Sequence, residues 1–416
     1  MTEKITLPNG LRIVHERLPG VRSCTLGLWV ESGSRHEPPE LCGISHYIEH
    51  MLFKGTDTRT AAQLAADFDA IGGQVNAFTT KEHTCYYCRT LDSHLQEAAG
   101  LLCDMFFHSK FAPRDVELEQ SVIFEEIDMY EDTPEDLVSE QLVAAVYDGC
   151  SLARPILGYK DTLAAINGDT LRDYRATRYT PENTVVALCG SYSDEDLALL
   201  VAQFEGMGQQ TPPSRGAVCY KPAFVVRKKE IEQNHLIAAF PSLETGSPER
   251  FVMQIMNNTL GGGMSSRLFQ RVREQQGLCY SIYSYTNAYF GAGALGIYVA
   301  LSARTELSAL TMIREELDRL CESGITEEEL ARSREQLKAN VLMGLEGTSS
   351  RMNTLARNEL IYGRQHTAED IIAGFDAVTR DDILKLAQRT FAFDAASLSA
   401  VGQVKTEADY RKAFGI

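Results

Sequence analysis

The sequence GISHYIEHMLFKGT, residues 43–56, contains two histidines four residues apart and a glutamate directly before the second one. On a helix, His46 and His50 lie on one face, so both imidazoles can reach the same metal ion. Glu49 is then close enough to contact a water molecule at an open position of that metal, rather than the metal itself. Two imidazoles and a neighbouring carboxylate on one helix predict a zinc hydrolase.

The flanking residues support a helix at this position. Glu37, Pro38 and Pro39 form a loop before Gly43, and Gly55 follows the last apolar residues. These signals predict a helix over residues 43–52 that ends near Gly55. The alternative is an accidental histidine pair on an ordinary helix, and it is disfavoured because the chain has only nine histidines.

A catalytic zinc site needs a third protein ligand and leaves a fourth position for water. Residues 116–132, VELEQSVIFEEIDMYED, combine helical apolar spacing with many carboxylates. Glu119 and Glu126 are about two helical turns apart and share a face that Glu125 does not. Glu126 is the candidate ligand, with Glu119 as an orienting carboxylate. Taken alone, the segment would be an ordinary solvated acidic helix. Its apolar residues are expected to pack on a core: Val116, Leu118, Val122, Ile123 and Ile127.

Several stretches resemble the pitrilysin-type zinc metallopeptidases, the inverzincins of family M16, which include mitochondrial processing peptidase and its bacterial relatives. Besides 43–56, they are LPNGLRIV at 7–14, Gly-Ser-Arg at 33–35, IGGQVNAFTTKEHTCYY at 71–87 and FEEIDMYEDTPED at 124–136. In that family the third zinc ligand is a glutamate 76 residues after the second histidine, and here 126 − 50 = 76. The resemblance therefore selects Glu126, and Glu119 matches the family's supporting carboxylate.

The second half of the chain carries another match, NNTLGGGMSSRLFQRVREQQGLCYSIY at 257–283. In the resembling family an arginine and a tyrosine of the C-terminal half close over the active site, and Arg273 and Tyr280 match this pair. A guanidinium and a phenol can donate hydrogen bonds to the oxyanion that forms when hydroxide attacks a peptide carbonyl. Without the resemblance, Arg273 would be an exposed helix residue and Tyr280 a half-buried strand residue.

The strand-like segment with Asn76, Ala77 and Phe78 follows two glycines and has the alternation of an edge strand. In the resembling peptidases this strand pairs with the substrate backbone, which fixes an extended peptide largely independently of its sequence. Phe53 and Phe78 are candidate apolar walls for the side chain beside the scissile bond. The alternative is that both are core residues.

Composition and charge limit the function classes. A net charge of −17 argues against nucleic acid and, in an enclosing peptidase, favours basic extended peptides, although a solubility role is equally compatible. No apolar run approaches the length of a membrane span. The N-terminus lacks a signal or transit pattern, so a cytoplasmic bacterial protein is expected.

The ten cysteines are expected to be buried and reduced. Cys85 and Cys88 should point to opposite faces of a strand, with a redox or metal role as the alternative.

The expected fold is α+β, with two related halves that each pack a mainly antiparallel sheet with helices. Residues 208–223 are rich in Gly, Pro and small polar residues and predict a linker between a zinc-binding domain at 1–207 and a homologous domain at 224–416. The second domain lacks H-x-x-E-H, since its corresponding helix holds Asn257 and Asn258. The resemblance implies that the halves face each other as a clamshell.

These observations predict a zinc endopeptidase, with one Zn²⁺ per chain, that encloses and hydrolyses unfolded or extended peptides. The alternative is a catalytically silent partner or scaffold subunit of a processing-peptidase-like complex. The enzyme is favoured because all the expected site residues occur on one chain, and for the same reason a homodimer is favoured over an obligate heterodimer. These residues are His46, Glu49, His50, Glu126, Arg273 and Tyr280.

Overall fold

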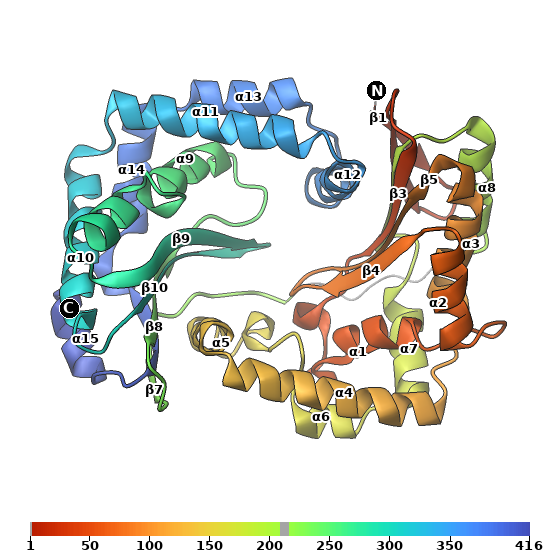
Figure 1. Cartoon of the computed structure of the whole chain (residues 1–416), viewed down its shortest axis with the longest axis horizontal. Helices are drawn as coiled ribbons and strands as arrows, with labels where there is room; N and C mark the ends of the chain where they lie inside the picture. Colours follow the sequence, from red (N-terminus) through yellow and green to blue (C-terminus); the bar gives the residue numbers. More distant parts are fainter. Residues whose placement is uncertain (1, 209–215) are drawn as a thin grey trace. The chain divides into compact units, whose positions relative to one another are not determined.

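The structure is a computed structural model that describes residues 2–208 and 216–416, and these form two compact units, each built on one β-sheet (Figure 1). Unit 1 comprises Met1–Asp128, Arg154–Gly216 and Met343–His366. Unit 2 comprises Met129–Ala153, Ala217–Leu342 and Thr367–Ile416. Each unit therefore takes segments from both halves of the chain.

Unit 1 contains a six-stranded sheet with the order β1-β2-β6-β3-β5-β4. Strands β2 and β6 are parallel, and the other neighbours in this sheet are antiparallel. Its strands are β1 (Thr2–Thr6), β2 (Arg12–Arg17), β3 (Ser23–Val30), β4 (Gln74–Thr79), β5 (Thr84–Leu91) and β6 (Thr184–Gly190). The strand that carries Asn76–Phe78, β4, lies at the edge of the sheet, as the alternation predicts.

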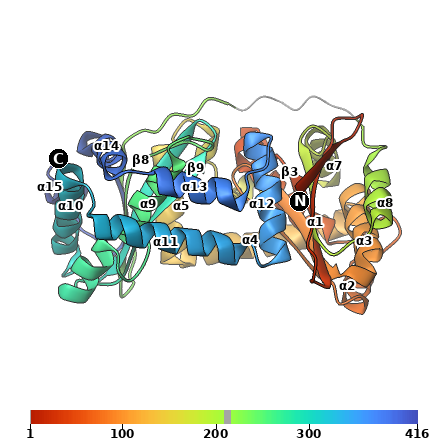
Figure 2. The ribbon, with the colours of Figure 1, turned by 90° about the horizontal axis from the view of Figure 1, so that it is seen from above.

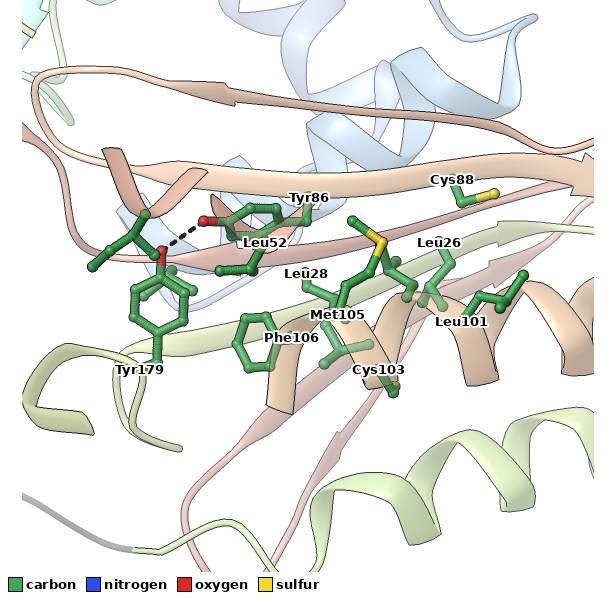
Figure 3. Close-up of a cluster of buried hydrophobic side chains, with 14 of the residues drawn as sticks. Leu26, Leu28, Leu52, Tyr86, Cys88, Leu101, Cys103, Met105, Phe106 and Tyr179 are labelled. Carbon is green, nitrogen blue, oxygen red and sulfur yellow. Dashed lines mark hydrogen bonds between the residues drawn. The ribbon is translucent and has the colours of Figure 1, made fainter. Parts of the chain in front are cut away.

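Helices cover both faces of this sheet. On one face, which we call the α3 face, Leu26, Leu28 and Tyr86 pack against Met105 and other residues of α3 (Figure 3). The buried hydroxyls of Tyr86 and Tyr179 are 2.7 Å apart within this core. The longer helices of the unit are α1 (Ile44–Leu52), α2 (Ala61–Ala70), α3 (Leu95–His108), α4 (Pro113–Asp132), α7 (Gly168–Arg178), α8 (Asp194–Phe204) and α12 (Thr348–Tyr362). Shorter ones are η1 (Ser34–His36), η2 (Pro39–Leu41), η3 (Asp92–His94) and α6 (Lys160–Ala164).

Unit 2 contains a five-stranded sheet with the order β7-β11-β8-β10-β9. Its strands are β7 (Phe224–Lys228), β8 (Asn234–Pro241), β9 (Cys279–Tyr289), β10 (Ala292–Leu301) and β11 (Ser397–Gly402). Its helices are α5 (Pro134–Val146), η4 (Ser151–Ala153), α9 (Arg250–Gly261), η5 (Phe269–Gln275), α10 (Glu306–Ser323), α11 (Glu327–Gly344), α13 (Ala368–Ala377), α14 (Arg380–Thr390), η6 (Phe393–Ala395) and α15 (Glu407–Phe414).

The two units repeat one strand plan, which confirms the expected α+β fold with related halves. Strand β2 of unit 1 runs parallel to β6, as β7 of unit 2 runs parallel to β11. Strands β6 and β11 each also pair antiparallel with a second neighbour, which is β3 in unit 1 and β8 in unit 2. Helix α9 follows β8 as α1 follows β3, and α9 contains Asn257 and Asn258 but no histidine.

The units exchange one helix each across the two halves of the chain. Helix α12, from the second half, packs on β3 and β6 of unit 1, and it lies beside β3 in both views of the ribbon (Figures 1 and 2). Helix α5, from the first half, packs on β8 and β11 of unit 2. The compact units therefore differ from the contiguous spans 1–207 and 224–416 at these helices. Residues 209–215 of the expected linker 208–223 lie outside the described residues.

The exchange follows from strands that are apolar on both faces. The second face of the unit 1 sheet, which we call the α12 face, presents Trp29, Cys85 and Val185, and these pack against Met352 and Leu355 of α12. Cys88 instead belongs to the core of the α3 face, so the two cysteines of the C-x-x-C pair lie on opposite faces as expected. Without α12, an apolar sheet face would be exposed to water.

A turn at residues 263–266 precedes the π-helical segment η5. One local expectation differs from the structure. Leu118 and Val122 of α4 are 58% and 45% exposed, because α4 packs on the core through Val116 and Ile123 on its other side. In the part of the chain that the structure describes, none of the helices combines the length and apolar composition that a membrane crossing needs.

Met352→Ala should destabilise unit 1 by about 2–5 kcal/mol, because it leaves a cavity where α12 meets the sheet. Met352 is fully buried, and its sulfur accepts a hydrogen bond from the indole of Trp29 at 3.3 Å. Trp29 is the single tryptophan of the chain, so its fluorescence during urea unfolding reports this contact. The matched control is Met343→Ala, where the side chain is 59% exposed and the cost should stay within about 0.5 kcal/mol. Equal costs for the two variants would contradict the packing of α12 on this sheet.

Candidate functional site

Helix α1 presents its buried residues and its polar residues on different faces. Ile44, Tyr47, Ile48 and Met51 have helical spacing and pack into the core of unit 1. His46, Glu49 and His50 lie on the other face and are half-buried. The sequence thus forms an amphipathic helix whose polar face consists of the H-x-x-E-H residues.

A buried carboxylate fixes the start of α1. Gly43, the residue before the helix, has a φ of 97° that favours glycine and offers no side chain to cap the first turn. Glu37 supplies the cap, since its two carboxylate oxygens accept hydrogen bonds from the backbone N–H groups of Gly43 at 2.7 Å and Ser45 at 2.8 Å. A negative charge at a helix N-terminus is also favoured by the helix dipole. Glu37 therefore holds the beginning of the helix that carries the histidines.

Three ligand atoms from two helices converge beside α1. The Nε2 atoms of His46 and His50 are 3.2 Å apart, and Oε2 of Glu126 on α4 lies 3.7 Å from the first and 3.6 Å from the second. Among the described residues, these three side chains are the one group of His, Cys, Asp and Glu that could hold a metal ion. The structure therefore brings together the three residues that the sequence predicted as ligands.

The spacing and the donor types fit zinc. Tetrahedral ligands at about 2.0–2.2 Å from zinc lie roughly 3.3–3.6 Å from each other, and two imidazoles with one carboxylate form a known catalytic set. Glu126 Oε2 is buried and has no hydrogen-bond partner among the described residues. Burying an unsatisfied carboxylate oxygen is costly, and a cation at this position would satisfy it.

Glu119 on α4 orients His50. Nδ1 of His50 lies 2.8 Å from Oε1 of Glu119, and the ammonium group of Lys54 lies 2.6 Å from Oε2. A proton on Nδ1 leaves Nε2 of His50 free to bind a metal. Burial alone would raise the pKa of Glu119, but its hydrogen bonds with His50 and Lys54 lower that pKa overall. Glu119 therefore remains ionised, as an orienting carboxylate must.

The pKa values of the two histidines move in opposite directions. Burial and the neighbouring His50 lower the pKa of His46 to about 3, so this imidazole is neutral near pH 7. Burial also lowers the pKa of His50, but the hydrogen bond to Glu119 and the charge of Glu126 outweigh it and raise the value. A neutral imidazole is the form that binds a metal.

Glu49 is held by a residue that the sequence analysis did not identify. The hydroxyl of Thr79, at the end of β4, donates a 2.5 Å hydrogen bond to Oε2 of Glu49. Burial raises the pKa of Glu49, and the hydrogen bond from Thr79 lowers it by less. Glu37 and Lys54 were also not singled out as site residues. Only Glu37 had a sequence signal, as an acidic residue shortly before the metal-binding helix.

The expected substrate-binding residues fall on different sides of β4. Ala77 packs toward the α3 face, on which α1 lies, whereas Phe78 packs on the α12 face with its ring 5.4 Å from that of Trp29. This position favours the core alternative for Phe78, because side chains of a strand alternate between faces. Asn76 is exposed, and Phe53 is half-buried at the end of α1.

Arg273 and Tyr280 belong to unit 2 and contact each other. The guanidinium carbon of Arg273, in η5, lies 5.8 Å from the centre of the Tyr280 ring and 4.6 Å from that of Phe269. Tyr280 is the second residue of β9, the edge strand of the unit 2 sheet, and is 72% exposed. Without the family resemblance, Tyr280 was expected to be a half-buried strand residue, and the structure shows that it is more exposed. Both donors are available to a ligand.

Glu126→Gln should lower zinc affinity because it removes a charged ligand. The loss should exceed the roughly 10- to 100-fold loss that follows when a residue hydrogen-bonded to a metal ligand is replaced. His46→Ala and His50→Ala should also lose the metal while the far-UV circular dichroism stays unchanged. Zinc content by mass spectrometry and competition with a chelator measure the effect. The matched control is Glu125→Gln, since Glu125 is exposed on the same helix. Loss of zinc from that control, or full zinc in Glu126→Gln, would contradict the site.

Glu37→Gln should remove one part of the pH dependence of stability. Burial raises the pKa of Glu37 to about 7 from an ordinary value of 4.5, although its two backbone hydrogen bonds lower it. The folded state thus binds the proton more tightly, so the contribution of Glu37 is complete below pH 4.5 and is lost as the pH rises through about 7.

Over this interval the stability of the wild type relative to Glu37→Gln should fall by on the order of 3 kcal/mol. Urea unfolding followed by Trp29 fluorescence at pH 5 and pH 8 measures the difference. Parallel pH profiles for the two proteins would show that Glu37 does not titrate in this way.

Comparison with known proteins identifies the family. The family model described as insulinase (peptidase family M16) matches residues 12–160, and the model described as peptidase M16 inactive domain matches residues 165–337. The uncharacterized zinc protease YmxG of Bacillus subtilis is 45% identical over 403 residues, which cover 95% of this chain and 97% of that protein. The uncharacterized zinc protease SCO5738 of Streptomyces coelicolor is 40% identical over 412 residues, covering 97% and 90%.

Solved structures share the fold at low sequence identity. A protease from Helicobacter pylori has a TM-score of 0.91 at 18% identity and covers 97% of this chain and 99% of its own. A chain of complex III2 from Candida albicans has a TM-score of 0.85 at 19% identity and covers 99% of both chains. The two family models and the bacterial relatives show that the chain belongs to the insulinase family of peptidases, family M16.

Proposed function

We propose that this protein is a zinc-dependent endopeptidase that hydrolyses unfolded or extended peptides, with one Zn²⁺ per chain. The observation that carries the proposal is the convergence of His46, His50 and Glu126 within 3.2–3.7 Å of one another, on the face of α1 that also bears Glu49. The names of the bacterial relatives, which are zinc proteases, support it.

In this mechanism Glu49 is the general base. Bound zinc would supply a lowered pKa for a coordinated water and polarisation of the substrate carbonyl. Glu49 would take a proton on Oε1, because Oε2 is already held by Thr79, and would later deliver that proton to the leaving amine. Its raised pKa brings it closer to neutral pH, where a general base that must also act as an acid is most effective.

We propose that the substrate backbone pairs with the free edge of β4. This strand pairs with β5 on one side, and no strand pairs with its other side within residues 2–208 and 216–416. An added strand would gain main-chain hydrogen bonds at Asn76 and Ala77 without a sequence requirement. Phe53, which shares a face of α1 with Glu49, is the better candidate for an apolar wall than Phe78. The net charge of −17 supports a preference for basic peptides.

The second half would contribute Arg273 and Tyr280 as oxyanion donors when the two halves close around a peptide as a clamshell. The support is chemical, since the two side chains contact each other and Tyr280 is exposed. A closed chamber would exclude water and admit unfolded chains but not folded proteins. Because both groups of residues occur on one chain, we also propose a homodimer rather than an obligate heterodimer. The cytoplasmic location expected from the sequence stays a prediction.

The alternative is a catalytically silent partner or scaffold subunit. The similarity in fold to a chain of complex III2 supports it, as does the match of residues 165–337 to a domain described as inactive. A silent subunit has no need for a complete metal-binding set, however, and this chain retains all three ligands and Glu49. We therefore favour the enzyme.

Glu49→Gln should retain zinc and peptide affinity but lose turnover by about 10²–10⁴-fold, because an amide cannot accept the proton. Cleavage of a mixed peptide library, followed by mass spectrometry at equal zinc content, measures the loss. Glu125→Gln serves as the matched control and should cleave at the wild-type rate. Near-normal cleavage by Glu49→Gln would assign the general base elsewhere.

Arg273→Ala and Tyr280→Phe should each lower kcat by about 10²–10³-fold with zinc content unchanged, as expected for loss of an oxyanion donor. The matched control is Tyr283→Phe on the same strand, because the hydroxyl of Tyr283 is used in a hydrogen bond to Glu135. Wild-type kcat in both variants, measured with the same peptides, would argue against a contribution of unit 2 to the reaction.

A further inference from the structure

Two cysteines far apart in sequence meet in unit 2. Cys150 lies between α5 and η4, and Cys219 lies in the expected linker 208–223, in the part that the structure describes. The backbone N–H of Cys219 donates to the sulfur of Cys150 at 3.4 Å, and that thiol in turn lies 3.8 Å from the carbonyl oxygen of Cys219. All ten cysteines were expected to be buried, and the exposed Cys219 and the half-buried Cys150 differ from that expectation.

The contact suits a disulfide. The sulfur of Cys150 lies within 4 Å of both main-chain polar atoms of Cys219, so the two residues are direct neighbours, as bridged cysteines are. The sulfur of Cys219 contacts the carbonyl oxygen of Tyr220 at 3.6 Å.

Neighbouring contacts hold the two residues in register. The N–H of Lys221 donates to the carbonyl of Val146 at 2.7 Å, and the ammonium of Lys221 lies 3.3 Å from Asp148. The hydroxyl of Tyr220 donates to Ser397 at 2.9 Å, and its ring lies 6.0 Å from that of Tyr147. Because these contacts flank both cysteines, the encounter of the thiols does not depend on the cysteines alone.

Cys219 is the one exposed cysteine of the ten, and Cys150 is less buried than six of the others. Burial raises the pKa of four other cysteines to about 12, which suppresses the reactive thiolate; these are Cys24, Cys88, Cys103 and Cys189. Burial also raises the pKa of Cys85 well above its ordinary value. An oxidant in solution therefore meets Cys219 first, with Cys150 in position to react next.

We propose that Cys150 and Cys219 form a redox-active pair that a small-molecule disulfide oxidises to an intramolecular disulfide. The Cys219 thiolate attacks the small disulfide, whose S–S bond breaks and releases one thiol. The Cys150 thiolate then attacks the sulfur of Cys219 in the mixed disulfide and releases the second thiol. Two protein thiols are oxidised, and one small disulfide is reduced to two thiols. This modification site is independent of the proposed peptidase activity.

The disulfide would fasten residues 218–223, which precede β7, to the end of α5, the helix that covers one face of the unit 2 sheet. Val218, Tyr220 and Ala223 of this segment already pack on the same apolar cluster as α5. Oxidation would therefore restrain two segments of unit 2, the one that follows α5 and the one that precedes β7. Reduction by dithiothreitol would release them.

The test uses the full-length protein and oxidised glutathione. After incubation, free thiols are alkylated in denaturant, and the peptides are identified by mass spectrometry without reduction. We expect a Cys150–Cys219 peptide as the main cross-link, two of the ten thiols lost, and both restored by dithiothreitol. Cys321→Ser, which removes a half-buried cysteine elsewhere, should form the same cross-link at an unchanged rate.

Cys150→Ser should instead accumulate glutathione on Cys219, because the resolving thiol is missing. The proposal is overturned if Cys150 and Cys219 are both recovered alkylated while other thiols are oxidised. It is equally overturned if the main disulfide joins other cysteines or two separate chains. These readouts do not involve peptide cleavage, so they remain decisive even if the proposed function fails.

Discussion

The contact between α1 and α4 is the constraint on which the candidate site depends. It brings two imidazole nitrogens and one carboxylate oxygen within 3.2–3.7 Å, although the ligands come from helices that are separate in sequence. Oε2 of Glu126 is buried there without a hydrogen-bond partner among the described residues, and a bound cation would satisfy it. Apolar packing and two carboxylates maintain the arrangement, since Glu37 fixes the start of α1 and Glu119 fixes the ring of His50.

The sheets impose a second constraint, because both of their faces are apolar. Each sheet has a face that is covered by a helix from the other half of the chain, α12 in unit 1 and α5 in unit 2. Each unit is therefore complete only when both halves are present. This dependence also connects the unit with the candidate metal site to the C-terminal half, because α12 covers the sheet whose edge strand holds Glu49 through Thr79.

The metal ligands could be predicted because helical periodicity and spacing place them on shared faces. His46 and His50 are about one helical turn apart, and the separation of 76 residues between His50 and Glu126 in the sequence matches the pattern of the resembling family. Other features have no local signal. Apolar strands show that a sheet is covered on both sides but not which helix covers it, and α4 carries apolar residues in two directions, so Leu118 and Val122 were wrongly assigned to a core. The bond between Thr79 and Glu49 joins residues that only the fold brings together.

Anomalous diffraction at the zinc absorption edge, from crystals of the whole chain, would locate the metal ion. We expect one zinc ion per chain, bound by Nε2 of His46, Nε2 of His50 and one carboxylate oxygen of Glu126 at about 2.0–2.2 Å. Nδ1 of His50 should remain hydrogen-bonded to Glu119. A zinc ion elsewhere in the chain, or one bound through Nδ1 of His50, would show that α1 and α4 do not form the site described above.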